Sequence, residues 1–418
     1  MAWLVVAYGG AVCAAENSLP DLITIGGART PAELVSIDAE GAFKFHDAVG
    51  EPRSVRATEL VRWSTPAEPR TGDEIILSDG SRLGLAPAWG KDPVVSFDGE
   101  QFVVRTTQFG RIECDRRGVC AVAWRLPGDK TRRSRILDKL CFASGDEPDG
   151  SDVLLLDNDD RLTGTLRRIG KRGNQSGDEP VVVTFDSSLG VVDLPVDRVR
   201  GVCLSGASGQ SKQDTIKAPL QLGLSDGSRL AADAIRREGD ELLIINPVLD
   251  TLRMRRTEDL VSLQSFHRRI TYLSMLEPTS YSHQPYLDLT FPYRQSRNVL
   301  GAPLQVGGRS YVTGLGMHSA ARLTFDLDGS YDRFAATVAI DDAANGGGSV
   351  VFRVFVRSGE DWTEAYSSEI VRGGDPPADV AVDLAGASQL VLKADYADRG
   401  DERDYANWLD ARLERLAK

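Results

Sequence analysis

One eight-residue segment occurs twice in this chain almost unchanged, and both copies predict a tight β-hairpin. Ile76–Leu83 reads ILSDGSRL, and Gly223–Leu230 reads GLSDGSRL. Asp-Gly between alternating apolar residues is a strong hairpin signal, because glycine adopts positive φ without strain. Two related turns, Gly26–Arg29 and Asn158–Arg161, also end in arginine. We therefore predict four related antiparallel β units before residue 270.

The ends of these units also match one another in pairs. Arg56–Val61 parallels Arg256–Val261, and the sequence RGVC occurs at Arg117–Cys120 and again at Arg200–Cys203. The spacing between units is uneven, which argues against a solenoid or propeller of constant period. We expect SH3-like or Sm-like barrels at residues 16–70, 71–142, 143–206 and 207–270. Units this small are only marginally stable in isolation, so we expect them to pack against one another.

Between the second and third units, apolar residues recur at helical spacing over Arg132–Phe142, which predicts a short connecting helix. From Tyr272 onward the character of the chain changes. Pro and Tyr become frequent, and short half-buried strands follow at intervals, which is typical of a β-sandwich. The expected strands are Arg322–Leu327, Phe334–Ile340, Ser349–Val356, Val380–Leu384, Leu390–Asp395 and Asn407–Leu413.

A glycine-rich stretch, Gly314–Ser319 (GLGMHS), precedes the first of these strands. Glycine permits a positive φ or the close approach of another segment. We expect a tight turn here, with His318 at its tip. Farther along the chain come Ile340-Asp341-Asp342, then Gly348–Val354, and finally Asp404–Leu413.

In this order, these motifs resemble the NPCBM domain, a carbohydrate-binding module found beside glycoside hydrolase family 98 catalytic domains. The resemblance covers residues 271–418 and implies a galactose-binding-like jelly-roll β-sandwich. The chain is therefore expected to be all-β, with tandem barrel-like units followed by this sandwich. Tyr405 and Asn407 stand where the family commonly has His and Asp, so the family does not fix the ligand specificity here.

Sugar binding requires side chains that hydrogen-bond hydroxyls and an aromatic face for the pyranose ring. The candidate ligand-binding residues are His318, Asp341, Asp342, Asn345, Trp362, Tyr405 and Asn407. Two alternatives stay open: His318 bonds a buried carbonyl, and the Asp341-Asp342 pair caps a loop through Asx turns. The fold also allows a structural calcium ion, for which the sequence names no ligands. No other cofactor is expected.

Charge and motifs narrow the function classes. The chain has 49 basic and 61 acidic residues, a net charge of −12, which argues against a nucleic-acid partner. It contains no G-x-S-x-G, no H-E-x-x-H, no P-loop and no G-x-G-x-x-G opening a helix. Adjacent acidic residues are too frequent here to indicate the carboxylate pair of a glycosidase. We therefore do not expect an enzyme.

The N-terminus predicts export. Apolar residues from Trp3 to Val12 are followed by Cys13-Ala14-Ala15, which resembles a signal-peptidase site. Residues 1–15 are read as a signal peptide too short to span a membrane, and the protein as secreted, periplasmic or at the cell surface. An exported protein with four remaining cysteines permits disulfides. We expect Cys114–Cys120 across a hairpin, with Cys120–Cys203 as the second connectivity.

The sequence thus favours an exported, non-catalytic protein that binds a galactose-type or related glycan through its C-terminal sandwich. The N-terminal units would then act as a spacer or as a docking scaffold for a protein partner. The alternative is an extracytoplasmic protein-interaction protein whose sandwich no longer binds sugar. A concave polar site with one accessible aromatic ring would favour sugar, whereas a flat apolar patch would favour protein.

Overall fold

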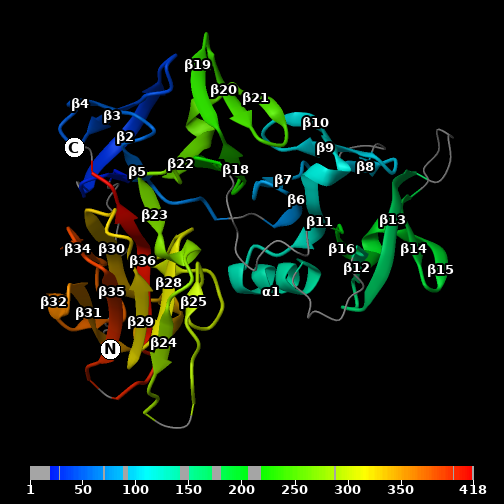
Figure 1. The fold of residues 1–418 in the computed structure, drawn as a ribbon. Helices are drawn as coiled ribbons and strands as arrows, with labels where there is room; N and C mark the ends of the chain where they lie inside the picture. The colour runs from blue at the N-terminus through cyan, green and yellow to red at the C-terminus, as the bar shows by residue number, and fades with distance from the viewer. Residues whose placement is uncertain are drawn as a thin grey trace, which may run out of the picture.

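The computed structural model of this chain describes residues 19–27, 29–68, 71–87, 93–141, 150–171, 180–205, 218–286, 289–398 and 400–416. Almost all regular structure in these residues is antiparallel β-strand, which confirms the predicted fold class. Small β units make up the chain before residue 266, and a two-sheet sandwich follows (Figure 1). The predicted signal peptide, residues 1–15, lies outside the described residues.

Each of the four β units has the same pairing scheme, in which the first strand lies between the second strand and the last. Unit 1 comprises β1 (Asp21–Thr24), β2 (Arg29–Ile37), β3 (Phe43–Asp47), β4 (Pro52–Val55) and β5 (Leu60–Trp63). Unit 2 comprises β6 (Gly72–Leu77), β7 (Arg82–Gly84), β8 (Val95–Phe97), β9 (Gln101–Thr106), β10 (Gly110–Asp115), η1 (Arg116–Gly118) and β11 (Val119–Leu126).

The later two units repeat this scheme. Unit 3 comprises β12 (Asp152–Leu156), β13 (Arg161–Lys171), β14 (Val181–Ser187), β15 (Gly190–Pro195), η2 (Val196–Arg198) and β16 (Val199–Cys203). Unit 4 comprises β17 (Leu220–Leu224), β18 (Arg229–Ala232), β19 (Ala234–Glu238), β20 (Glu241–Asn246), β21 (Asp250–Met254), η3 (Thr257–Asp259) and β22 (Leu260–Ser265). The common scheme explains why the turns and final strands match in sequence.

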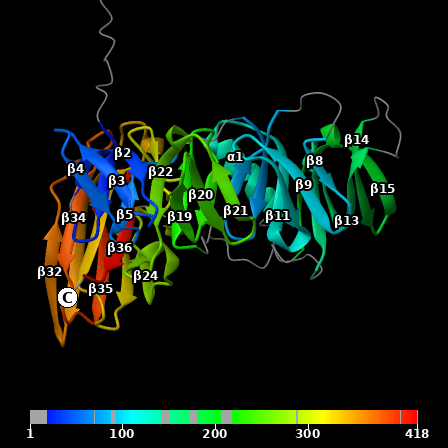
Figure 2. The ribbon, with the colours of Figure 1, turned by 90° about the horizontal axis from the view of Figure 1, so that it is seen from above.

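The units do not follow one another in space as they do along the chain. β5 of unit 1 pairs with β22 of unit 4, β18 of unit 4 with β7 of unit 2, and β11 of unit 2 with β16 of unit 3. The spatial order is therefore 1–4–2–3, which Figure 2 shows as a row. One hydrophobic core runs through all four units. Because a unit of this size buries too little surface alone, the shared core stabilises the array.

The predicted connecting helix is α1 (Lys130–Cys141), which joins unit 2 to unit 3. Its Leu137 and Leu140 pack into a small cluster with residues of β11, β12 and β16. Gly201 of β16 permits this approach, because a Cβ there would lie 2.6 Å from Leu140 Cδ2. In the described part of the chain, no helix is both long enough and apolar enough to cross a bilayer.

The structure does not contain the expected Cys114–Cys120 bond, since the four described cysteines are free thiols. The expectation assumed a hairpin, but β10 pairs with β9 whereas β11 pairs with β6 and β16. The second connectivity is also absent. Cys203 lies opposite Ala121 and not opposite Cys120 where β16 pairs with β11, and both thiols are free.

The C-terminal sandwich consists of two antiparallel sheets, in the orders β25-β28-β36-β30-β34 and β24-β29-β35-β31-β32. Its elements are β23 (Ile270–Tyr272), η4 (Leu273–Met275), β24 (Ser280–His283), β25 (Arg294–Gln295), β26 (Gln305–Val306), β27 (Arg309–Ser310), β28 (Gly314–His318), β29 (Ala321–Asp326), β30 (Arg333–Ile340), η5 (Asp342–Ala344), β31 (Ser349–Ser358), β32 (Asp361–Ser367), β33 (Val371–Arg372), β34 (Ala378–Asp383), β35 (Gln389–Tyr396) and β36 (Tyr405–Glu414). Trp408 lies at the centre of the core, with its ring 5.1 Å from that of Phe352. The six predicted strands are present.

The glycine-rich stretch is a strand, not the expected turn. β28 pairs with β36 along its whole length, and the turn comes after it, at Ser319-Ala320. The glycines allow another segment of the chain to approach the strand closely, because a Cβ on Gly316 would lie 2.4 Å from the carbonyl oxygen of Arg297. They therefore let the segment 294–298 lie directly against β28.

A buried ion pair joins unit 1 to the sandwich. Arg62 of β5 donates from Nε to Asp410 Oδ2 of β36 at 2.7 Å, and their side chains are 4% and 1% exposed. Thr313 Oγ1 donates to the other oxygen of Asp410 at 2.8 Å, and the Arg62 guanidinium lies over the Tyr311 ring. Outside this pair, Gly26 N donates to Glu414. The joint is therefore polar, buried and directional.

Replacement of Arg62 by alanine should destabilise the full chain strongly, because the Asp410 carboxylate would stay buried without its cation. Breaking a buried pair in this way costs about 3–5 kcal/mol. Urea unfolding followed by circular dichroism measures this change. Arg56→Ala, which removes an exposed arginine paired with Glu59, should leave the midpoint unchanged. Equal midpoints for the two variants would contradict the role assigned to the joint.

Candidate functional site

Asp341 is the centre of a buried hydrogen-bond cluster. Its Oδ1 accepts from Asn298 Nδ2 at 2.9 Å and from Ala343 N at 3.0 Å, and its Oδ2 accepts from Asn407 Nδ2 at 2.6 Å and from Gln305 N at 3.1 Å. Burial raises the pKa of Asp341, and the four donors oppose that rise. Both carboxylate oxygens of Asp341 therefore accept hydrogen bonds from protein donors. The sandwich thus brings Asp341 and Asn407 together as predicted, but in the interior.

His318 lies in an aromatic cluster at the same end of the sandwich. Its ring stacks on Phe291 at a centroid distance of 4.1 Å, with His283 at 5.7 Å and Tyr405 at 6.1 Å. His318 is 2% exposed. Burial, followed by the neighbouring His283, lowers its pKa to about 4. These contacts favour the structural alternative for His318, whose partners are the aromatic cluster and the backbone of Ser319.

The other candidate residues do not converge on one site. Asp342 accepts from Gly307 N and Gly308 N, both at 2.8 Å, so it clamps a neighbouring loop. Asn345 ends η5 in the left-handed conformation and is exposed. Trp362 is 43% exposed on β32, opposite Arg357. Because β31 starts at the Asp341 end of the sandwich and runs to Ser358, Trp362 lies at the opposite end.

A groove of about 750 Å³ lies between the sandwich and α1; we call it the junction groove. Ala343 of η5 borders it, next to the Asp341 cluster. The remaining lining residues come from α1 (Thr131, Ser134, Arg135, Asp138) and from the segment before β28 (Tyr293, Arg294, Gln295, Arg297, Leu300, Gly301, Ala302). Its volume lies within the range of small-ligand sites.

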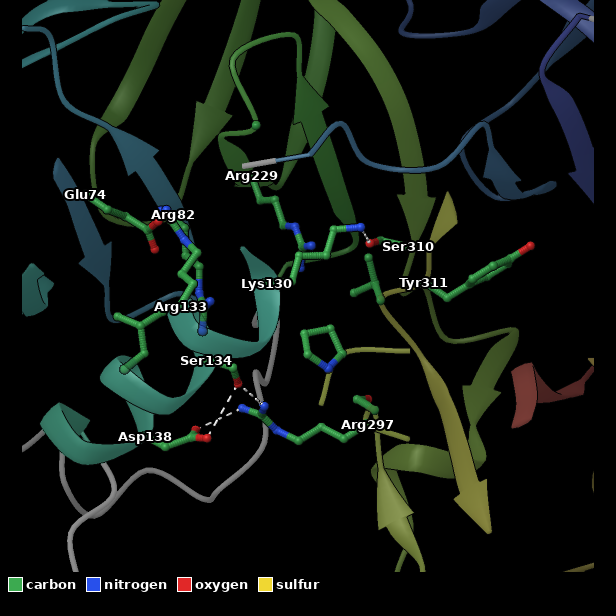
Figure 3. A pocket seen from close by; sticks show the side chains of 15 residues that line it. Glu74, Arg82, Lys130, Arg133, Ser134, Asp138, Arg229, Arg297, Ser310 and Tyr311 are labelled. Atoms are coloured by element: carbon green, nitrogen blue, oxygen red, sulfur yellow. Dashed lines mark hydrogen bonds and ion pairs between the residues drawn. The ribbon is translucent and has the colours of Figure 1, made fainter. Parts of the chain in front are cut away.

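The junction groove combines polar groups with one aromatic side chain. Arg297 lines the groove, with its guanidinium 3.1 Å from Asp138 and in contact with Ser134 (Figure 3). Tyr293 is half-buried, and its ring packs 5.1 Å from that of Tyr281. Sequence reasoning did not identify these residues as a site. The only sequence signal for this part of the lining was the high frequency of Tyr and Pro before residue 294.

Comparison with known families and proteins is consistent with this architecture. Residues 269–414 match the family model of the NPCBM/NEW2 domain. The C-terminal sandwich is an NPCBM/NEW2 domain. The match confirms the resemblance found from the motifs around Gly314, Asp341 and Trp408, and it covers the strands from β23 to β36.

Two curated relatives each match a little over a quarter of this chain. Alpha-1,3-galactosidase B of Akkermansia muciniphila is 33% identical over 121 residues, which are 28% of this chain and 15% of that protein. A protein of Renibacterium salmoninarum, whose name gives endo-alpha-N-acetylgalactosaminidase as its proposed activity, is 30% identical over 113 residues, 27% of this chain and 7% of that protein. The chain therefore spans a small part of the relatives that it matches.

A solved structure with a similar fold is that of CBM51 from Clostridium perfringens GH95, in complex with methyl-galactose. It is 24% identical to this chain, covers 34% of this chain and 99% of its own, and has a TM-score of 0.30.

The resemblance implies an Asp where this chain has Asn407, the residue that meets Asp341. An Asp at position 407 would place a second carboxylate at the 2.6 Å contact, and two close carboxylates cannot both be charged without a shared proton or a cation. The amide of Asn407 instead donates to Asp341. In the described ranges, no group of three or more His, Cys, Asp or Glu side chains is arranged to hold a metal ion. The calcium expectation remains a prediction.

The stability of the NPCBM domain should depend on pH through His318. Because its pKa in the folded state, about 4, lies below the usual value of ~6.5, protonation favours unfolding. Stability should therefore be lost as pH falls from about 6.5 to 4, by up to ~3 kcal/mol relative to His318→Gln. The titration of Asp404 opposes this loss of stability in both proteins. Burial raises the pKa of its carboxyl to about 6, so its protonation favours the folded state.

Urea unfolding of the wild type and of His318→Gln at several pH values between 4 and 8 measures the difference. The wild-type curve should fall toward the variant curve, or below it, as the solution becomes acidic. Parallel curves over this range would show that the imidazole is not held neutral by its surroundings.

Proposed function

We propose that this chain is an exported, non-catalytic glycan-binding protein in which a galactose-type sugar occupies the junction groove. The observation that carries the proposal is the NPCBM/NEW2 domain at residues 269–414, together with the groove that its own segment 293–302 forms against α1. The named activities of the two curated relatives, on galactose and N-acetylgalactosamine linkages, support this class of sugar.

The lining of the groove matches the needs of sugar recognition. A pyranose presents an apolar face to an aromatic ring and hydroxyls to donors and acceptors around it. Tyr293 offers the ring, and Arg294, Arg297, Ser134 and Asp138 offer polar groups. This is a concave polar surface with one aromatic side chain, which favours sugar over a protein partner. Exposed Trp362 lies too far from the groove to contribute.

The N-terminal units have a positioning role in this proposal. α1 of unit 2 supplies one wall of the groove, and the joint at Arg62 and Asp410 fixes unit 1 against the sandwich. Unit 3 lies at the far end of the row (Figure 2). It acts as a spacer or as the docking site for a protein partner. Export follows from the apolar segment at residues 3–12.

Calorimetric titration of the full chain with methyl galactoside and with N-acetylgalactosamine tests the proposal. A groove open on one side gains a few hydrogen bonds and one stacked face, so millimolar to micromolar affinity, about −4 to −8 kcal/mol, is expected. Tyr293→Ala should weaken binding at least about tenfold, by ~1.4 kcal/mol.

Trp362→Ala is the matched control, since it removes another accessible aromatic side chain from the same domain. It should leave affinity unchanged. Equal losses in the two variants, or a loss in Trp362→Ala alone, would place the sugar elsewhere. No heat with any galactose-, fucose- or N-acetylhexosamine-bearing glycan would favour the protein-interaction alternative.

A further inference from the structure

The face of the sheet that α1 covers carries a buried cysteine. Cys203 of β16 lies opposite Ala121 of β11 on one side and opposite Val153 of β12 on the other. Residues directly opposite each other on antiparallel strands share one face of the sheet. These three residues belong to one apolar cluster, which α1 completes with Leu137 and Leu140. The side chain of Cys203 is therefore directed toward α1.

A second cysteine approaches this position from α1. Cys141 is the last residue of α1, and it packs against the same apolar cluster. Gly201 lies two residues before Cys203 on the same face of β16, and its missing side chain lets Leu140 approach the sheet. The end of α1 is thereby held against β16. Both cysteines are free thiols in this structure, and the thiol of Cys141 hydrogen-bonds with that of Cys203.

Both thiols are shielded from solvent once the chain has folded. Cys203 is 2% exposed. Hydrogen bonding with Cys203, followed by burial, raises the pKa of the Cys141 thiol well above its ordinary value. Because the thiolate is the reactive form of cysteine, Cys141 reacts slowly in the folded protein. Any covalent chemistry between the two residues therefore belongs to the folding of the chain, before α1 covers the sheet.

We propose that Cys141 and Cys203 form a disulfide bond when this chain folds in an oxidising compartment. The two thiols lose two protons and two electrons, and one S–S bond forms. A disulfide of an oxidant, either a thiol oxidase or oxidised glutathione, takes up those electrons and protons and becomes two thiols. The inference rests on the export in the proposed function, because disulfides persist in oxidising compartments.

The bond would act on two parts of the structure. It would close a loop that contains β12 to β16, the whole of unit 3, and such a cross-link restricts the unfolded chain. It would also fix the end of α1 to the sheet. The other side of α1 lines the junction groove with Ser134 and Asp138. The disulfide would thus hold in place one wall of the proposed glycan site.

Peptide mapping tests this pairing directly, because trypsin places the five cysteines on separate peptides. Cys13 lies on 1–29, Cys114 on 112–116, Cys120 on 118–125, Cys141 on 140–161 and Cys203 on 201–212. The full chain is exported to a bacterial periplasm behind an added export signal, alkylated without reduction and digested.

Mass spectrometry should find peptide 140–161 joined to peptide 201–212 in most molecules. Two alkylated peptides in place of this pair would overturn the proposal. A bond from Cys141 or Cys203 to any third cysteine would overturn it as well. The added signal makes this result independent of how the natural chain is exported.

Thermal midpoints give a second readout. Dithiothreitol should lower the midpoint of the exported wild type by at least about 3 °C, because reduction opens the loop. Cys203→Ser should show no such change. Cys141→Ser repeats this test at a less buried position, which guards against misfolding of the first variant. Cys114→Ser is the matched control, since it removes another buried thiol, and it should respond as the wild type does.

The comparison is made within each protein, with and without reductant, so a general loss of stability in a variant does not affect it. Equal responses of the wild type and both Cys203→Ser and Cys141→Ser would overturn the proposal.

Titration of the exported wild type with methyl galactoside separates this inference from the proposed function. A cross-linked chain that binds no glycan would retain the disulfide and reject the glycan proposal. A chain that binds galactoside but carries free Cys141 and Cys203 would reject the disulfide and leave the glycan proposal standing.

Discussion

The buried ion pair between Arg62 and Asp410 determines how the two halves of this protein face each other. Taking both charges out of water is costly, so the pair contributes orientation more than net stability. Its hydrogen bond, with that from Gly26 N to Glu414, holds the sandwich against unit 1, while Thr313 binds the other oxygen of Asp410 from within the sandwich. The junction groove lies between α1 and the sandwich. Without this orientation the groove would lack one of its walls.

Local charge and overall charge differ in this molecule. The excess of acidic residues keeps the chain negative as a whole, yet most of the charged residues that line the region between α1 and the sandwich are arginine or lysine. Such clefts focus an electrostatic field that the net charge does not reveal. Composition argues against a nucleic-acid partner on the scale of the whole surface, but it carries no information about the charges that line one groove.

Local patterns predicted most of the fold, because strands, turns and one helix each depend on nearby residues. The repeated turns at Asp79 and Asp226 and the final motif at Trp408 are examples. Features set by distant partners were not predictable. Gly316 is a strand residue because Arg297 lies against it, and Cys114 and Cys120 lie on strands that pair elsewhere. Asp341 and His318 were expected at one binding rim, but both are buried, and their burial depends on Asn298 and Phe291, which come from an irregular segment.

The central claim is that the sugar lies between the NPCBM domain and α1, and a crystal structure of the full chain soaked with methyl galactoside tests it most directly. The account predicts electron density for the sugar in the junction groove, with its ring against Tyr293 and a hydroxyl within hydrogen-bond distance of Ser134 or Arg297. Density for the sugar at the His318 end, beside Trp362, or on the N-terminal units alone would contradict it.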